Sequence, residues 1–154
     1  MPFLRQHKVN ITWSSNFAYA IGLIASDGCL STDGRHIYFS SIDKELIDKF
    51  LSALNITNTI FIGHSGTGGQ YYATNFGDIV FYTFLYSIGL TRAKSKTIKK
   101  VDVPDRFFGD FFRGIFDGDG SFYSFWDKRW PHSFDFRLTL ASASWKFLEW
   151  IKAL

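Results

Sequence analysis

The sequence predicts an α+β fold made of two similar halves, a pseudo-twofold αββαββα repeat whose second copy is incomplete. Two observations lead to this prediction. An apolar segment that contains a glycine and ends in Asp-Gly occurs twice, once ending at Asp27-Gly28 and once at Asp119-Gly120. A run with strand-like alternation of apolar and polar residues follows each copy. Self-similarity of this kind indicates a duplicated structural unit.

The composition is that of a folded protein with one domain or two small halves. Its 154 residues are 46% hydrophobic and 19% aromatic, which suffices for a bulky core and argues against disorder. The net charge of +3 mildly favours an anionic partner. Cys29 is the only cysteine, so neither a disulfide framework nor a Cys-rich zinc site is expected.

The sequence indicates neither membrane insertion nor secretion. No apolar run approaches the length needed to span a bilayer. Residues 1–13 lack the apolar core of a signal peptide because they carry Arg5, Gln6, His7, Lys8 and Asn10. We therefore expect a soluble protein that does not bind membranes and is cytoplasmic, with an organellar location also compatible.

The first half, residues 1–90, is expected to have the order α-β-β-α-β-β-α. Ser14 and Ser15 can each cap a helix over residues 17–25, which is apolar on all sides and is therefore predicted to be buried. Gly28 is expected to end this helix with a positive φ. Hydrophobic periodicity then predicts strands at 29–31 and 36–41, a helix at 44–54, strands at 59–63 and 70–75, and a helix at 78–88.

A basic linker, residues 91–103, leads into the second half, residues 104–154. This half is expected to contain a helix that opens at Pro104 and ends at Asp119, strands at 121–126 and 134–140, and a helix at 145–153. The second strand alternates apolar residues, expected to point inward, with polar ones, expected to point outward: Phe134, Phe136, Leu138 and Leu140 against Asp135, Arg137 and Thr139. Counterparts of residues 55–88 are missing, so this half is expected to be truncated, with an exposed strand edge.

The repeated helices are predicted to bring two carboxylates together. If Gly22 packs against Gly114, the two backbones can approach closely, and Asp27 and Asp119 emerge at the same end of the seam. Each carboxylate then faces a like charge and lies at a negative helix C-terminus, which costs roughly 0.3–1 kcal/mol. A divalent cation would reverse both penalties, and ligation by oxygen alone suits Mg²⁺ rather than zinc.

A metal held between two carboxylates beside a basic linker suggests phosphodiester hydrolysis. The outward strand faces are then expected to follow double-stranded DNA, because a two-stranded ribbon fits the major groove. The expected DNA-binding residues are Ser31, Arg35, Tyr38, Ser40, Gln70, Tyr72 and Thr74 in the first half and Tyr123, Lys128, Arg129, Arg137 and Thr139 in the second.

The two motifs resemble the paired signature motifs of the LAGLIDADG homing endonucleases, in the single-chain form that carries two copies. The matching positions are Gly22, Leu23, Ile24, Asp27 and Gly28 in the first copy and Gly114, Asp117, Asp119 and Gly120 in the second. The resemblance extends through the order of elements in both halves and through the linker. It implies two central motif helices flanked by antiparallel, saddle-shaped sheets that straddle duplex DNA.

The resemblance also implies a site-specific, metal-dependent DNA endonuclease of the mobile-intron or intein type, with Asp27 and Asp119 binding the catalytic Mg²⁺ ions. Lys94 or Lys96 is the basic residue expected near the active site. Ala25 stands in the first motif where the second has Asp117, so Asp117 is not expected to join symmetric chemistry. With two motifs the chain is expected to be a monomer, or a dimer if a second molecule supplies the missing elements.

Two other functions are compatible with the sequence. A nucleic-acid-binding protein that does not cleave, similar to a maturase or a transcription factor, could keep this scaffold. The retained aspartates argue against this reading, whereas the truncation favours it. The third reading is an inactive remnant. The basic cluster in the linker is equally compatible with a solvated segment and with phosphate contacts.

Overall fold

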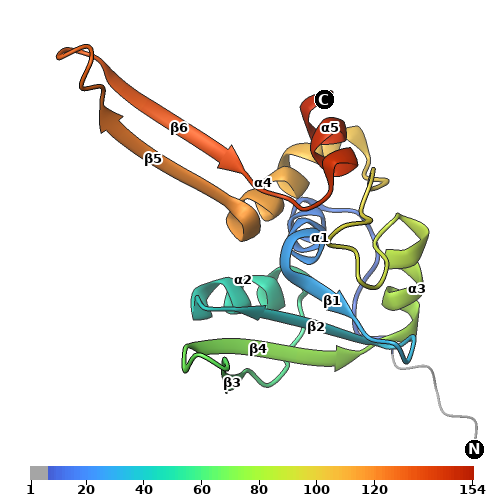
Figure 1. The fold of residues 1–154 in the computed structure, drawn as a ribbon. Coiled ribbons are helices and arrows are strands. Elements are labelled where there is room, and N and C mark those ends of the chain that lie inside the picture. Colours follow the sequence, from blue (N-terminus) through green and yellow to red (C-terminus); the bar gives the residue numbers. More distant parts are fainter. Residues whose placement is uncertain (1–6) are drawn as a thin grey trace, which may run out of the picture.

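The computed structural model describes residues 7–154 and confirms an α+β fold (Figure 1). The stretch considered for a signal peptide falls partly on residues 1–6, which lie outside the described residues. The elements of the first half are α1 (Ser15–Asp27), β1 (Gly28–Leu30), β2 (His36–Ser41), α2 (Lys44–Leu54), β3 (Phe61–His64), β4 (Gln70–Gly77) and α3 (Ile79–Ser87). After the linker come a 3-10 turn (Asp105–Phe107), α4 (Phe108–Asp119), β5 (Gly120–Trp126), β6 (Phe134–Leu140) and α5 (Trp145–Lys152).

Helix α1 begins where the sequence indicates but ends in a different way. The Ser14 hydroxyl caps it by accepting a hydrogen bond from the backbone N–H of Phe17 at 3.1 Å. Gly28, however, has φ −75° and ψ 149°, so the predicted positive φ is wrong. The chain passes directly from the helix into β1, and a Cβ at Gly28 would lie 2.7 Å from the Cα of Ile24. Glycine is required here by this close approach.

The first half folds around a four-stranded antiparallel sheet in the order β1-β2-β4-β3. One face of this sheet packs against α1, α2 and α3, as Figure 1 shows. Phe39 on this face is buried and stacks on Phe50 of α2 with ring centroids 4.3 Å apart. The opposite side, here called the outer face, carries Tyr38 opposite Asn75 and Ser40 opposite Ala73.

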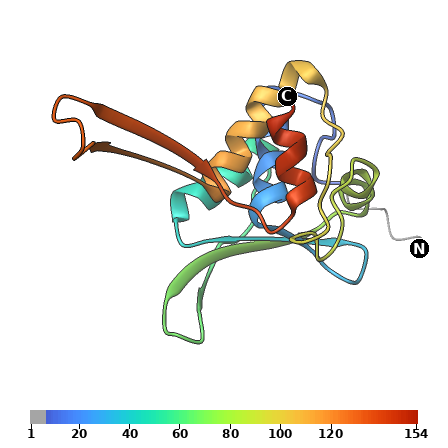
Figure 2. The ribbon, with the colours of Figure 1, turned by 45° about the horizontal axis from the view of Figure 1, so that its top comes forward.

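Helices α1 and α4 pack side by side in the middle of the molecule, and α5 lies against α4 (Figure 2). Phe111 and Ile115 of α4 are fully buried in this core. Trp150 of α5 contacts Phe108 and Phe111 with ring centroids 5.8 and 5.9 Å away. The linker also contributes to the core, because Ile98 is buried.

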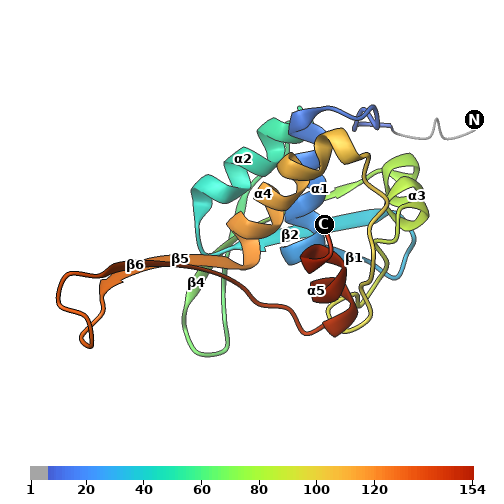
Figure 3. The same cartoon turned by 90° about the horizontal axis from the view of Figure 1, so that it is seen from above.

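The β5–β6 hairpin projects away from the helices (Figures 1 and 3). Phe136 and Leu138 are 66% and 71% exposed and Phe134 is 42% exposed, so the prediction that these residues point into a core is wrong. Leu140, at the base of the hairpin, is partly buried. The cause lies in α5, which packs on α4 and leaves the hairpin uncovered, whereas α2 covers the sheet of the first half.

Within residues 7–154 no helix combines the length and the apolar character needed to cross a membrane.

Candidate active site and nucleic-acid surface

The two motif helices touch backbone to backbone at Gly22 and Gly114. A Cβ on Gly22 would overlap the carbonyl oxygen of Phe111 and lie 2.9 Å from the Cα of Gly114. A Cβ on Gly114 would overlap the carbonyl oxygen of Tyr19 in the same way. Any side chain at either position would therefore push the helices apart, and the crossing places their C-terminal ends together.

Asp27 and Asp119 lie at these adjacent C-terminal ends. A Cβ on Gly118 would lie 2.8 Å from Asp27 Oδ2, so the Asp27 carboxylate rests against the last turn of α4. Burial and, to a smaller extent, the charge of Asp119 raise the pKa of Asp27 to about 6, although Lys94 opposes the shift. Burial also raises the pKa of Asp119, again opposed by Lys94. The fold thus holds a half-buried carboxylate, Asp27, beside the more exposed carboxylate of Asp119, and the two repel each other.

Lys94 reaches this pair from the linker. Its side chain is buried, and its Nζ donates a hydrogen bond to the carbonyl oxygen of Gly28. Burial lowers the pKa of Lys94, while charge interactions with Cys29, Asp27 and Asp119 oppose that shift. Lys96 is exposed. Of the two lysines considered from the sequence, the structure therefore brings Lys94 to the carboxylates and leaves Lys96 on the surface.

The acidic pair fits a hard divalent cation. Among the described residues, no group of three His, Cys, Asp or Glu side chains is placed to hold a metal, so the protein offers Asp27 and Asp119 alone. Two carboxylates leave coordination positions for water or phosphate oxygens, which is the arrangement Mg²⁺ prefers. The repulsion between these two like charges is compatible with a bound cation, because a cation would remove it. A hollow of about 320 Å³ adjoins Asp119 and is lined in part by Ser26 and Ser95.

Asp117 takes a different role from Asp119. Its Oδ2 accepts a hydrogen bond of 2.7 Å from the hydroxyl of Tyr19 in α1, and the Arg113 guanidinium lies 4.4 Å from the centroid of the Tyr19 ring. These three residues line a separate open hollow of about 490 Å³ between α1, α2 and α4. Asp117 therefore ties the two motif helices together away from the acidic pair.

The predicted DNA-binding residues of the first half divide between the two faces of the sheet. Tyr38 and Ser40 lie on the outer face. Thr74 is fully buried and Tyr72 packs against the core, so both were wrongly placed on the DNA-facing side. The physical reason is the register of the strands. Thr74 pairs with Phe39, which belongs to the core face, and Tyr72, two residues before Thr74 in the same strand, lies on the same side of the sheet. Gln70 lies on that side too, since its amide donates to the Tyr72 hydroxyl at 3.0 Å.

The outer-face residues that sequence reasoning missed include Phe61, Tyr71 and Asn75. Strand β4 extends to Gly77, beyond the predicted end, and Phe76 near that end is buried. Counting alternate residues back from Phe76 places Asn75 and Tyr71 outward, a signal that the sequence contains. Phe61 could not be placed in this way, because its position follows from pairing with Ala73.

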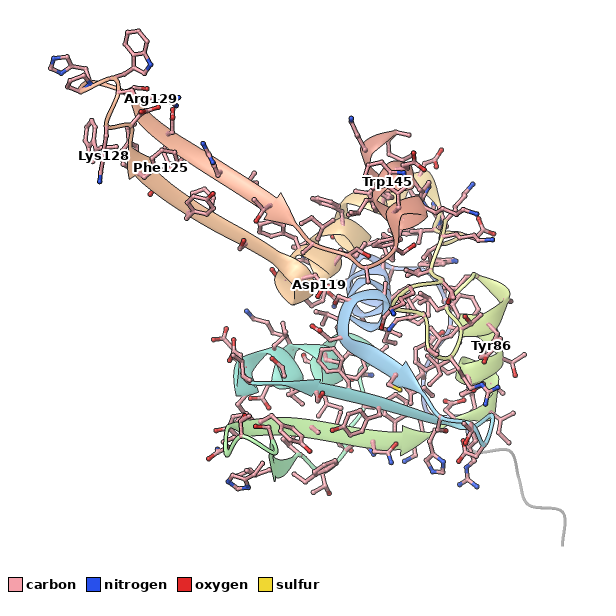
Figure 4. The ribbon with its side chains drawn as sticks, viewed as in Figure 1. Tyr86, Asp119, Phe125, Lys128, Arg129 and Trp145 are labelled. Atoms are coloured by element: carbon pink, nitrogen blue, oxygen red, sulfur yellow. The ribbon has the colours of Figure 1, made fainter. Side chains whose placement is uncertain are left out.

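The remaining predicted contacts lie in turns and on the hairpin. The Ser31 hydroxyl donates to Asp33 in the β1–β2 turn, and Arg35 extends from that turn over Gly77 of the outer face. In the hairpin, Tyr123 pairs with Arg137 and Ser121 with Thr139, so these residues share one face. Lys128 and Arg129 lie at the far tip, distant from Asp119 (Figure 4), and Arg129 pairs with Asp127 at 2.9 Å.

Comparisons with known proteins place this geometry in context. Residues 14–89 match the family described as the LAGLIDADG-like domain. A search of curated proteins gives no match. Among solved structures, full-length DUF199/WhiA from Thermatoga maritima is similar over 80% of this chain, with a TM-score of 0.45 and 16% identity. The chain spans 43% of that protein's length. A variant of I-DmoI, crystallised with its target DNA in the presence of manganese, is similar over 75% of this chain and 69% of its own, with a TM-score of 0.42 and 17% identity.

Proposed function

From the membership of residues 14–89 in the LAGLIDADG-like domain family, we propose that this protein is a divalent-metal-dependent endonuclease that cuts double-stranded DNA at a specific site. The observation that carries the proposal is the acidic pair Asp27 and Asp119 with Lys94 beside it. One chain supplies both carboxylates, which supports action as a monomer. Because such an enzyme must reach DNA, we also propose an intracellular location.

In this proposal Asp27 and Asp119 hold Mg²⁺. When bound, the ion would polarise the scissile phosphate and lower the pKa of a bound water. The carboxylates keep their anionic form for this task, since neutralisation by a cation offsets the burial that raises their pKa values. Because Lys94 is buried and Asp27 is half-buried, solvent screens the interaction between these two charges less than it would on an open surface.

Lys94 would act on the phosphate group that is cleaved. Its ammonium is held by the Gly28 carbonyl directly after Asp27, so its position is fixed relative to the carboxylates. Because burial lowers the pKa of Lys94, its Nζ can give up and regain a proton more readily than an exposed lysine. We assign it the roles of stabilising developing negative charge and of moving a proton at Nζ.

The direct test is cleavage of a supercoiled plasmid library of randomised duplex sequences, with Mg²⁺ and with EDTA. We expect Mg²⁺-dependent cuts at one sequence, lost in Asp27→Asn and in Asp119→Asn. Asp117→Asn is the matched control, because this carboxylate lies in the same motif but bonds to Tyr19. Cleavage that persists in the Asp27→Asn, Asp119→Asn double variant would contradict the proposed site.

A protein that binds nucleic acid without cutting it is the second candidate. The outer face of the four-stranded sheet favours it, because Tyr38, Ser40 and Asn75 present aromatic and hydrogen-bonding groups whatever the state of the acidic pair. Salt-sensitive binding to duplex DNA, combined with no cleavage of any library sequence in Mg²⁺ or Mn²⁺, would support this function and reject the endonuclease.

A further inference from the structure

Within residues 92–97 of the linker only Lys94 is buried. Its neighbours Ala93 and Ser95 are both exposed, whereas the Nζ of Lys94 reaches inward to the carbonyl oxygen of Gly28. The chain must therefore bend inward at Lys94 and outward again directly after it. The residues that enforce this bend decide where the ammonium group lies.

Ala93 adopts a backbone conformation that alanine avoids. Its φ is 49°, in the left-handed region. Among the described residues Asn55 is the other non-glycine residue with a positive φ, and asparagine tolerates that conformation well. In alanine the Cβ comes too close to the following carbonyl oxygen. Because the Ala93 side chain is exposed, its own packing does not offset this cost, so contacts of the adjoining residues must hold the conformation.

Tyr86 of α3 holds the linker just before Ala93. Its hydroxyl oxygen accepts a hydrogen bond of 3.2 Å from the backbone N–H of Arg92. Its ring stacks on that of Tyr82, with centroids 5.3 Å apart, and this packing orients the hydroxyl. Figure 4 shows Tyr86 on α3, well apart from Asp119. Tyr86 can therefore influence the acidic pair only through the linker.

Backbone hydrogen bonds hold the linker after Ala93. The carbonyl oxygen of Lys94 accepts hydrogen bonds from the N–H groups of Thr97 at 3.0 Å and Ile98 at 2.7 Å. Ile98 is buried, and its carbonyl oxygen accepts a hydrogen bond from the hydroxyl of Ser144, which caps α5. The chain is thus fixed on both sides of the left-handed residue.

We propose that Tyr86 and Ala93 are positioning residues that hold the Nζ of Lys94 beside Asp27 and Asp119. Tyr86 fixes the backbone before the bend, and the left-handed conformation of Ala93 turns Lys94 toward the Gly28 carbonyl. The importance of this position for cleavage rests on the proposed function, in which Lys94 acts on the cleaved phosphate.

Cleavage kinetics of two variants test the proposal. Tyr86→Phe keeps the ring but removes the acceptor for the Arg92 N–H. Ala93→Val introduces a β-branched side chain, which disfavours a positive φ. Each is expected to lower kcat by about tenfold or more, because displacement of a catalytic group is costly. KM should change little, since the displaced group acts mainly in the transition state.

Two further variants serve as matched controls. Ala93→Gly keeps the left-handed conformation without its cost, so it should cleave as the wild type does and raise Tm by about 2–4 °C. Tyr82→Phe also removes a hydroxyl from α3, but this hydroxyl donates to the Ser31 carbonyl oxygen and not to the linker. Its kcat should equal that of the wild type.

Acetylation of lysines by an amine-reactive reagent gives a readout that does not depend on cleavage. Mass spectrometry measures the rate at Lys94 against that at the exposed Lys96 in the same protein. Because Lys94 is buried, this ratio should be low in the wild type and in both controls. It should rise several-fold in Tyr86→Phe and Ala93→Val.

The two readouts separate this inference from the proposed function. An unchanged labelling ratio in both Tyr86→Phe and Ala93→Val overturns the proposal, and so does an equal loss of kcat in Tyr82→Phe. A raised ratio with unchanged kcat supports the positioning of Lys94 but rejects its role in cleavage. If the wild type cleaves no DNA, the labelling ratio still tests which residues hold Lys94.

Discussion

Gly22 and Gly114 face each other at the point where α1 crosses α4, and a Cβ on Gly114 would lie 3.0 Å from the Cα of Gly22. The atoms that a Cβ at either glycine would meet are backbone atoms, which cannot rotate away as a side chain could. The seam between the two motif helices therefore depends on these two glycines, and so does the approach of Asp27 to Asp119.

Gly22→Ala is expected to lower the free energy of unfolding by about 3 kcal/mol, at the upper end of the usual cost of overpacking. Gly109→Ala is the matched control within α4, because open space surrounds the position of its Cβ. That change should be neutral or should stabilise the helix by about 0.5–1 kcal/mol. Urea denaturation measures both, and equal effects of the two changes would contradict the close crossing.

Lys94→Met is expected to slow DNA cleavage by about 100-fold or more, as is typical when a group that transfers a proton is removed. Lys96→Met should leave the rate almost unchanged because this side chain is exposed. Single-turnover cleavage at saturating enzyme gives both rates, and duplex binding by the two variants serves as the control. A loss in Lys96→Met as large as that in Lys94→Met would reject the assignment of Lys94.

The metal-free protein should be more stable at pH 5 than at pH 7. The pKa of Asp27 is about 6 in the folded protein, against about 3.9 in an unfolded chain. A raised carboxyl pKa contributes stability that is complete below the unfolded value and is lost as pH rises through the folded one. Thermal melts in EDTA should therefore show Tm falling from pH 5 to pH 7. Asp27→Asn should flatten this slope, and Mg²⁺ at pH 7 should raise Tm; a slope that survives in Asp27→Asn would exclude Asp27 as its origin.

Tyr19→Phe is expected to destabilise the protein by about 1 kcal/mol, because it removes the hydrogen bond to Asp117 that joins α1 to α4. A double-mutant cycle with Asp117→Asn should show a coupling of similar size. Tyr123→Phe provides the control, since Tyr123 is exposed on the hairpin. Additive effects of the two changes in the Tyr19 and Asp117 cycle would show that the bond contributes nothing.

Ile37 and Leu138 occupy equivalent strand positions in the two halves but have opposite surroundings, since Ile37 is fully buried and Leu138 is 71% exposed. Ile37→Ala should therefore cost about 2–5 kcal/mol, and Leu138→Ala no more than about 0.5 kcal/mol. Chemical denaturation at two protein concentrations measures both. A large cost for Leu138→Ala that grows with protein concentration would instead show that another copy covers the hairpin.

Local patterns in the sequence were sufficient to predict most of the elements. The periodicity of residues 44–54 predicted the bounds of α2 and its buried face, because an apolar stripe is encoded by neighbouring residues. The duplicated motif likewise predicted two helices of the same kind. Such local sequence patterns could not determine which face of β4 is buried. Thr74 and Tyr72 suit either face of the strand until its register with β2 is known.

The sequence by itself determined the α+β class, the order of the elements and the pairing of two glycine-containing helices that end in Asp27 and Asp119. These features follow from interactions within a helical turn or between repeated segments. Only the tertiary structure decided that Lys94 and not Lys96 meets the carboxylates, that Tyr71 and Phe61 share the outer face, and that Leu138 is exposed. The reason is physical: burial and charge depend on what packs across from a side chain, and those partners come from distant parts of the chain.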